Sequence, residues 1–201
     1  MPASAPAPGN PHPPPFVTPG DGKNLNLCFP GNPSGTFTDR LADAAFRQLI
    51  VGADAVIDVH AGDMVEALEP FALYDAVPAE AGARELATAY GLGYVIRQEP
   101  GPDRAVGGTT SAAAATLGIP AIIAEAGGCG LVEQAAVETH VRGLNRVLAV
   151  LGMAGDRPPD DPGRDLPTCG ASCGCAAPTR AGGNPRSGPG RPWPRGSCSA
   201  P

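Results

Sequence analysis

Short apolar segments alternate with segments of helical periodicity between Asp21 and Met153, and this alternation restricts the fold more than any other feature of the sequence. A β-branched run bounded by turn residues is typical of a buried strand, whereas apolar residues at i, i+4 and i+8 indicate a helix. The expected strands cover residues 53–59, 94–96 and 119–124, and the expected helices cover residues 38–52, 78–90, 109–118 and 131–151. Thr38 is the expected N-cap of the first helix, and either Thr109 or Thr110 that of the third. Strands that alternate with helices predict a three-layer α/β/α domain with a mostly parallel or mixed sheet.

Proline and glycine divide the chain into three parts. They account for 25 and 28 of the 201 residues and gather toward the two ends. Residues 1–20 form a Pro-rich lead that we expect to be disordered, and residues 21–154 form the domain. Residues 155–201 contain few aliphatic side chains and cannot bury enough apolar surface to offset the loss of chain entropy, so we expect a disordered low-complexity tail.

The cysteines do not predict a disulfide framework. Four of the six lie in the C-terminal tail, and Cys28 and Cys129 stand apart from each other in the patterned region. The tail spacing C-x3-C-x-C has no matching distal pair, which favours a low-complexity segment over a metal site. We expect free thiols in a reducing compartment.

Charge and hydropathy exclude several classes of function. The formal net charge is −6, whereas a protein that neutralises nucleic-acid phosphates needs a basic face. No apolar run is long enough to cross a membrane, and the first residues lack the basic and apolar regions of a signal peptide. We therefore expect a cytoplasmic protein whose partner is a small molecule, and the sequence leaves its oligomeric state open.

Two polar residues follow apolar strands directly. His60 ends the segment Val56-Ile-Asp-Val59, and Glu125 ends the segment Ile119–Ala124. In α/β sheets the carboxyl ends of strands face the binding crevice. His60 suits a metal ligand, a general base or a structural histidine, and Glu125 suits either a general base or a residue that caps the following turn. Asp58 shares a strand face with His60 and could orient its ring.

The segment Asp21-Gly-Lys-Asn-Leu-Asn-Leu-Cys-Phe-Pro-Gly31 is the most distinctive stretch of the chain. Asn24 and Asn26 alternate within it, between a Pro/Gly turn and the Phe-Pro-Gly triplet. One interpretation is a loop whose amides bind a substrate. The other is a network of Asx turns that only fixes the shape of the loop.

Four motifs in this order resemble the succinylglutamate desuccinylase/aspartoacylase family, which has the zinc-carboxypeptidase-like fold. They are the DGKNLN and FPG segment, the strand that ends in Ile-Asp-Val-His60, the segment from Gly118 to Gly128, and the helix segment from Gly143 to Gly152. The resemblance implies a zinc-dependent deacylase that hydrolyses an amide or ester bond of a small acylated substrate. It implies that His60 is a zinc ligand, that Glu125 activates the zinc-bound water, and that Asn24 and Asn26 lie in the substrate-binding segment, Asn26 matching the asparagine of the family's Asn-Arg pair.

The sequence departs from the family at three places. The family's other two zinc ligands come from an upstream His-x-x-Glu segment, and His12 is followed by no glutamate at that spacing. Leu27 stands where the family has an arginine, and a leucine cannot hold a carboxylate by two hydrogen bonds. The tail replaces a β-rich C-terminal region. These departures predict a truncated, incomplete fold with an unpaired sheet edge.

A catalytic zinc site uses three protein ligands, so we expect weak or absent Zn²⁺ binding and impaired hydrolysis in this chain. The alternative function is a non-catalytic binding or interaction module that retains the α/β core. A serine hydrolase is disfavoured, because the chain has no Gly-x-Ser-x-Gly segment.

Overall fold

A five-stranded mixed sheet forms the centre of the computed structural model, which describes residues 16–99, 108–154 and 168–170. The strands lie in the order β1-β4-β2-β3-β5. Their bounds are β1 Val56–His60, β2 Phe71–Asp75, β3 Tyr94–Gln98, β4 Ala121–Glu125 and β5 Thr168–Gly170. The helices are α1 Phe37–Ala45, α2 Glu80–Tyr90, α3 Thr110–Thr116 and α4 Gln134–Val150, with a 3₁₀ turn at Leu25–Leu27 and a π-helical turn at Phe46–Ile50.

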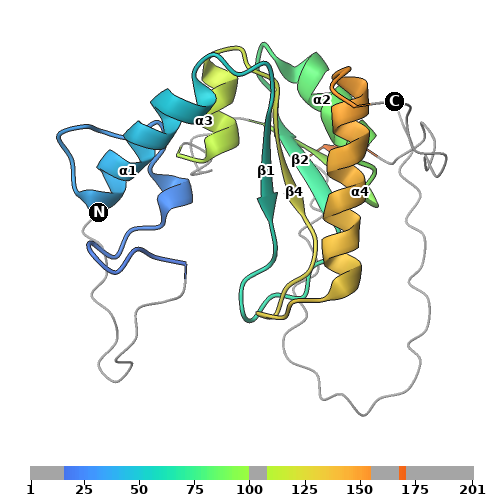
Figure 1. Ribbon diagram of the computed structural model, residues 1–201, viewed down its shortest axis with the longest axis horizontal. Coiled ribbons are helices and arrows are strands. Elements are labelled where there is room, and N and C mark those ends of the chain that lie inside the picture. The colour runs from blue at the N-terminus through green and yellow to red at the C-terminus, as the bar shows by residue number, and fades with distance from the viewer. Residues whose placement is uncertain (1–15, 100–107, 155–167, 171–201) are drawn as a thin grey trace.

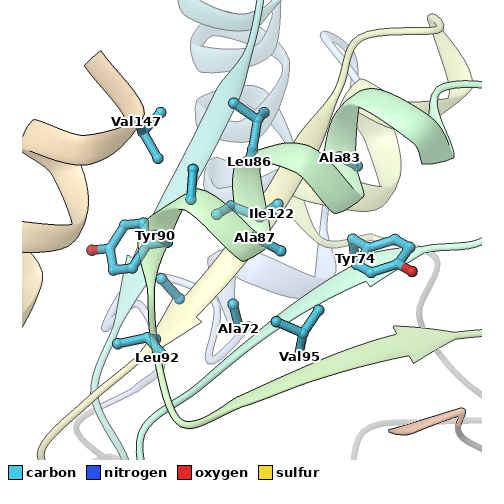
Figure 2. Packing of buried hydrophobic residues seen from close by; sticks show 12 residues of the cluster. Ala72, Tyr74, Ala83, Leu86, Ala87, Tyr90, Leu92, Val95, Ile122 and Val147 are labelled. Carbon is cyan, nitrogen blue, oxygen red and sulfur yellow. The ribbon is translucent and has the colours of Figure 1, made fainter. Parts of the chain in front are cut away.

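Helices cover both faces of the sheet, which confirms the predicted α/β/α architecture. Figure 1 shows the sheet nearly edge-on, with α1 and α3 on one side and α2 and α4 on the other. The larger core lies between the sheet and the α2–α4 layer, where Tyr74, Tyr90, Ile122 and Val147 are almost fully buried (Figure 2). A smaller core on the α1–α3 side contains Phe29. Small side chains fill much of both cores, in keeping with the alanine content of the chain.

The strand directions divide the sheet into two parts. β4 runs parallel to β1 but antiparallel to β2, and β3 runs parallel to β2. The carboxyl ends of β1 and β4 therefore meet at one end of the sheet, and those of β2 and β3 meet at the other. β1 and β5 are the two edge strands of the described sheet.

β2 is absent from the sequence prediction, which gave only three strands. Its sequence, Phe-Ala-Leu-Tyr-Asp, contains no β-branched residue and therefore lacks the run used to identify the others. Its place in the sheet comes from pairing with β4 on one side and β3 on the other, two contacts that no local pattern reveals.

Two predicted helix starts need correction. Thr36, not Thr38, precedes α1, and Thr38 is buried with its backbone N–H donating to Asp21 Oδ2 over 2.9 Å. α4 begins at Gln134, three residues after the predicted start, because Gly130 has a φ of +65° and Leu131 N–H closes a turn onto Gly128. The starts of α2 and α3 lie within two residues of the prediction, whereas β1 begins at Val56, three residues after its predicted start. Thr109 caps α3 through a bond from Ala112 N–H, and Gly91 ends α2 in the left-handed conformation.

One short part of the expected disordered tail is structured. Thr168–Gly170 pairs in parallel with β3, and this pairing needs only backbone groups at an open strand edge, not aliphatic side chains. The expected disorder of residues 1–15 and of the rest of 155–201 lies outside the described residues. Within the described residues, none of the helices combines the length and the apolar character needed to span a bilayer.

Gly143 provides a test of the α2–α4 packing. A Cβ at this position would overlap the ring of Tyr90, which is fully buried. Alanine favours a helix over glycine by about 1 kcal/mol, but forcing a methyl group into a filled core costs about 1–3 kcal/mol. We expect Gly143→Ala to lower the free energy of unfolding by about 1–2 kcal/mol, measured by urea denaturation.

Gly93→Ala is the matched control. A Cβ there would lie 3.6 Å from Pro70 O, an ordinary contact. If the two variants unfold at the same urea concentration, the close approach of Tyr90 to α4 is not a real constraint on the packing.

Candidate active site

The parallel pairing of β1 with β4 brings His60 and Glu125 side by side. They are register partners at the last position of each strand, so their side chains leave the same face of the sheet. His60 Nδ1 lies 3.8 Å from Glu125 Oε1. The structure thus brings together the two strand-end residues that the sequence singles out.

Asp58 fixes the orientation of the His60 ring. Its Oδ1 lies 3.0 Å from His60 Nε2, and a carboxylate oxygen can only accept a hydrogen bond. The proton of a neutral His60 therefore sits on Nε2, which leaves the Nδ1 lone pair facing Glu125. The hydrogen bond to Asp58 raises the pKa of His60 above its usual value, despite the opposing effect of burial.

Asp58 itself remains ionised. Burial raises its pKa, but hydrogen bonds from His60 and the Thr110 hydroxyl, together with the charge of His60, outweigh burial and hold the pKa of Asp58 below its usual value. A permanent negative charge therefore lies behind the ring, on the side opposite Glu125.

Glu125 lies in a drier environment. Its side chain is only 16% exposed, and its Oε2 is buried with no hydrogen-bond partner within the part of the chain that the structure describes. Burial raises the pKa of Glu125, and the negative charges of Asp58, Glu66 and Asp63 act in the same direction against the effect of His60. Such a carboxylate accepts a proton more readily than one in water.

Asn26 connects this site to the start of α3. Its Oδ1 accepts from Thr110 N–H over 2.9 Å, which assigns its Nδ2 to the side facing His60 and Asp58. Nδ2 donates to Asp58, and it lies 3.1 Å from His60 Nε2, which cannot accept from it while that nitrogen carries the imidazole proton. Much of the hydrogen-bonding capacity of Asn26 is thus used inside the protein, and its predicted role in substrate binding stays a prediction.

Asn24 forms an Asx turn. Its Oδ1 accepts from Asn26 N–H over 2.9 Å and caps the 3₁₀ turn at Leu25–Leu27. Both interpretations of this segment therefore remain open, because Asn24 shapes the loop and also lines the adjacent cleft. Leu27 is 55% exposed and does not line that cleft.

An open cleft of about 500 Å³ lies beside His60, on the α1–α3 side of the sheet. Its lining combines the polar groups described above with apolar side chains from the preceding loop. The lining residues are Phe16, Val17, Thr18, Pro19, Asn24, Leu25, Asn26, Phe29, Asp58, His60 and Thr110. Sequence reasoning did not assign Thr110 to the site, because its partner Asn26 is 84 positions away in the chain.

Arg97 does not take the place of the arginine that the family has at the position of Leu27. It lies on β3, whose carboxyl end is at the other end of the sheet from His60. Its guanidinium pairs with Glu80, with a 3.0 Å bond from Nη2 to Oε2. Arg104, a second arginine that could supply such a contact, lies outside the described residues.

The donor groups fit one zinc ligand and a neighbouring base, but not a complete zinc site. A neutral imidazole with its second nitrogen bonded to a carboxylate is a common arrangement for a metal-binding histidine. Within residues 16–99, 108–154 and 168–170, no group of three His, Cys, Asp or Glu side chains is placed to hold a metal ion.

The effect of the Asp58–His60 hydrogen bond can be measured by titrating His60. In metal-free protein, Asp58→Asn removes the negative charge that stabilises protonated His60, so we expect the pKa of His60 to fall. NMR titration of the imidazole resonances can measure this change in the pKa of His60, because the chain has only three histidines. The stabilisation linked to a raised histidine pKa is present below the unfolded pKa and is lost as pH rises through the folded pKa. The stability difference between the wild type and the variant should therefore shrink over that interval.

Asp54→Asn is the control, because Asp54 is exposed and precedes the same strand. It should leave the pKa of His60 unchanged. An unchanged His60 titration in Asp58→Asn would contradict the orienting role of Asp58.

Comparison with known proteins identifies the family. The catalytic-domain model of the succinylglutamate desuccinylase/aspartoacylase family matches residues 16–151. The N-alpha-acetyl-L-2,4-diaminobutyric acid deacetylase of Halomonas elongata is 32% identical over 162 residues, which are 78% of this chain and 46% of that protein.

Two solved structures resemble the fold. The product-bound structure of the ectoine utilization protein EutE (DoeB) from Ruegeria pomeroyi superimposes with a TM-score of 0.67 at 26% identity, over 77% of this chain and 46% of that chain. The succinylglutamate desuccinylase/aspartoacylase structure from Rhodobacter sphaeroides has a TM-score of 0.63 at 26% identity, over 77% of this chain and 45% of that chain.

The chain thus spans slightly less than half the length of these relatives. The match covers both strand ends of the site and the segment that contains Asn24 and Asn26, and it confirms the resemblance seen in the sequence. This chain belongs to the succinylglutamate desuccinylase/aspartoacylase family of deacylases.

Proposed function

We propose that this chain provides the general base and one metal ligand of a zinc-dependent deacylase that hydrolyses the amide or ester bond of a small acylated substrate. The observation that carries the proposal is the placement of His60 Nδ1 opposite Glu125, with His60 Nε2 held by Asp58. The deacetylase activity in the name of the Halomonas elongata relative is consistent with this reaction type.

His60 is the proposed zinc ligand. Asp58 keeps the proton on Nε2, so Nδ1 presents its lone pair toward the space beside Glu125. The negative charge of Asp58 also makes the imidazole a better donor to a cation. Bound zinc would lower the pKa of a coordinated water, but the described residues supply one of the three protein ligands that a catalytic zinc site uses.

Glu125 is the proposed general base. Its raised pKa and its buried, unbonded Oε2 suit a group that takes a proton from water and passes it to the leaving group. Its position on a rigid strand end holds the carboxylate at one place relative to His60. A side chain on a mobile loop would not provide this alignment.

The charges that line the cleft favour a substrate whose acyl group carries no additional carboxylate. No Lys or Arg side chain is among its described lining residues, whereas Asp58 places a negative charge there. A dicarboxylate acyl group would need a cationic partner on entering such a site. We therefore infer a neutral or cationic acylated substrate.

Paired substitutions test the roles of the two residues. Zinc content is measured by elemental analysis, and acid release is measured from N-acetyl and N-succinyl amino acids. We expect wild-type chain to hold much less than one zinc per molecule and to hydrolyse slowly. His60→Ala should lower the zinc content further, whereas Glu125→Gln should preserve it and reduce hydrolysis by about 10²–10⁴-fold.

Glu85→Gln, an exposed change on α2, is the control and should match the wild type in both assays. Glu125→Gln with unchanged hydrolysis would refute the base assignment, and one tightly held zinc per chain would overturn the expectation of weak binding. If substrate binds at the cleft but no variant, wild type included, releases acid, the chain is a binding module.

Substrate preference provides a separate prediction. We expect kcat/KM for an N-acetyl diamino acid to exceed that for an N-succinyl dicarboxylic acid, because the latter brings extra carboxylates next to Asp58. The comparison is made at one ionic strength, since salt screens charge effects. Equal values, or a preference for the dicarboxylic substrate, would exclude the charge argument.

A further inference from the structure

Tyr90 and His140 form a polar pair on the α2–α4 side of the sheet, opposite the cleft. The Tyr90 hydroxyl lies 2.8 Å from His140 Nδ1, and the two rings meet edge-on with their centres 6.1 Å apart. Tyr90 is fully buried and points its hydroxyl toward α4 (Figure 2). Gly143, one turn further along α4, leaves room for the ring.

The other nitrogen of His140 reaches the strand that carries Glu125. Nε2 lies 3.3 Å from the carbonyl oxygen of Ala126, the next residue in the chain. A carbonyl oxygen only accepts, so Nε2 carries the proton and Nδ1 accepts from the Tyr90 hydroxyl. One tautomer of His140 thus satisfies both contacts, and the carbonyl of Ala126, which can only accept, fixes that tautomer.

The turn after Glu125 is also bonded to β1. Ala126 N–H donates to His60 O over 3.2 Å, and Gly62 N–H donates to Gly127 O over 3.1 Å. Ala126 is 2% exposed, so loss of a partner for its carbonyl would leave a buried polar group unsatisfied. A continuous set of bonds therefore runs from Tyr90 through His140 and Ala126 to the backbone of His60.

We propose that His140 is a positioning residue of the candidate active site, which holds the turn at Ala126 and Gly127 so that Glu125 stays against His60. This assignment rests on the proposed roles of those two residues. Glu125 Oε2 has no hydrogen-bond partner among the described residues, so the position of this carboxylate depends on the backbone that carries it. His140 is attached to that backbone from the side opposite the cleft and touches neither His60 nor the substrate cleft.

The test compares two substitutions of His140 in the full chain. His140→Leu removes the donor and keeps an apolar side chain, whereas His140→Gln keeps an N–H donor at a similar reach. Hydrogen exchange is followed at the Ala126 and Gly62 amides and at the β3 amides, which are remote from the turn. NMR at one fixed pH records the His60 imidazole resonances. Glu138→Gln, an exposed change on α4, is the control.

We expect Ala126 and Gly62 to exchange at least about tenfold faster in His140→Leu, which corresponds to loss of a bond worth about 1.4 kcal/mol, while β3 is unchanged. The His60 resonances should shift in His140→Leu and return toward wild type in His140→Gln. If the β3 amides accelerate equally, His140 has a merely structural role and the proposal is overturned. Unchanged exchange at Ala126 and Gly62, unmoved His60 resonances in His140→Leu, or resonances that do not return toward wild type in His140→Gln would also overturn it. Neither readout needs turnover, so failure of the proposed hydrolysis is recognised separately.

Discussion

The parallel pairing of β1 with β4 is the constraint on which the candidate site depends. It makes His60 and Glu125 register partners, so a one-residue slip would send one of the two side chains to the opposite face. β4 is apolar and buried from Ala121 to Ala124, with Ile122 and Ala124 in the α2–α4 core, and a slip would turn the charged side chain of Glu125 toward that core. The packing of the core thereby fixes the polar geometry at the strand ends.

Around this pairing, the site is built from four separate parts of the chain. β1 provides Asp58 and His60, β4 provides Glu125, and the loop with Asn26 joins the start of α3 through Thr110. The resulting environment is asymmetric. Asp58 receives several hydrogen bonds and stays ionised, whereas Glu125 is partly desolvated and holds a proton more readily. The two carboxylates flank one imidazole and have opposite electrostatic character, which suits one for orientation and the other for proton transfer.

The sequence predicted the parts of the fold that local pattern encodes. Strands rich in β-branched or aliphatic residues and glycine-terminated helices were recognisable, and His60 and Glu125 stood out because each polar residue ends an apolar run. β2 was missed because it contains no β-branched residue and its position depends on pairing with both neighbouring strands. The contribution of Thr110 and the bond from His140 to Ala126 could not be predicted either. Both depend on helices docking onto the sheet, and spacing along the chain carries no information about that.

The position of β1 at the edge of the described sheet has a further consequence. Its outer backbone groups have no strand partner among the described residues, and yet this strand carries the proposed metal ligand. If an extended segment paired with β1 in parallel and ended level with His60, its last residues would lie at the same end of the sheet as His60 and Glu125. This edge therefore leaves backbone groups open to pairing, and it is the place where an added strand, from the same molecule or another, could contribute donor atoms to the site.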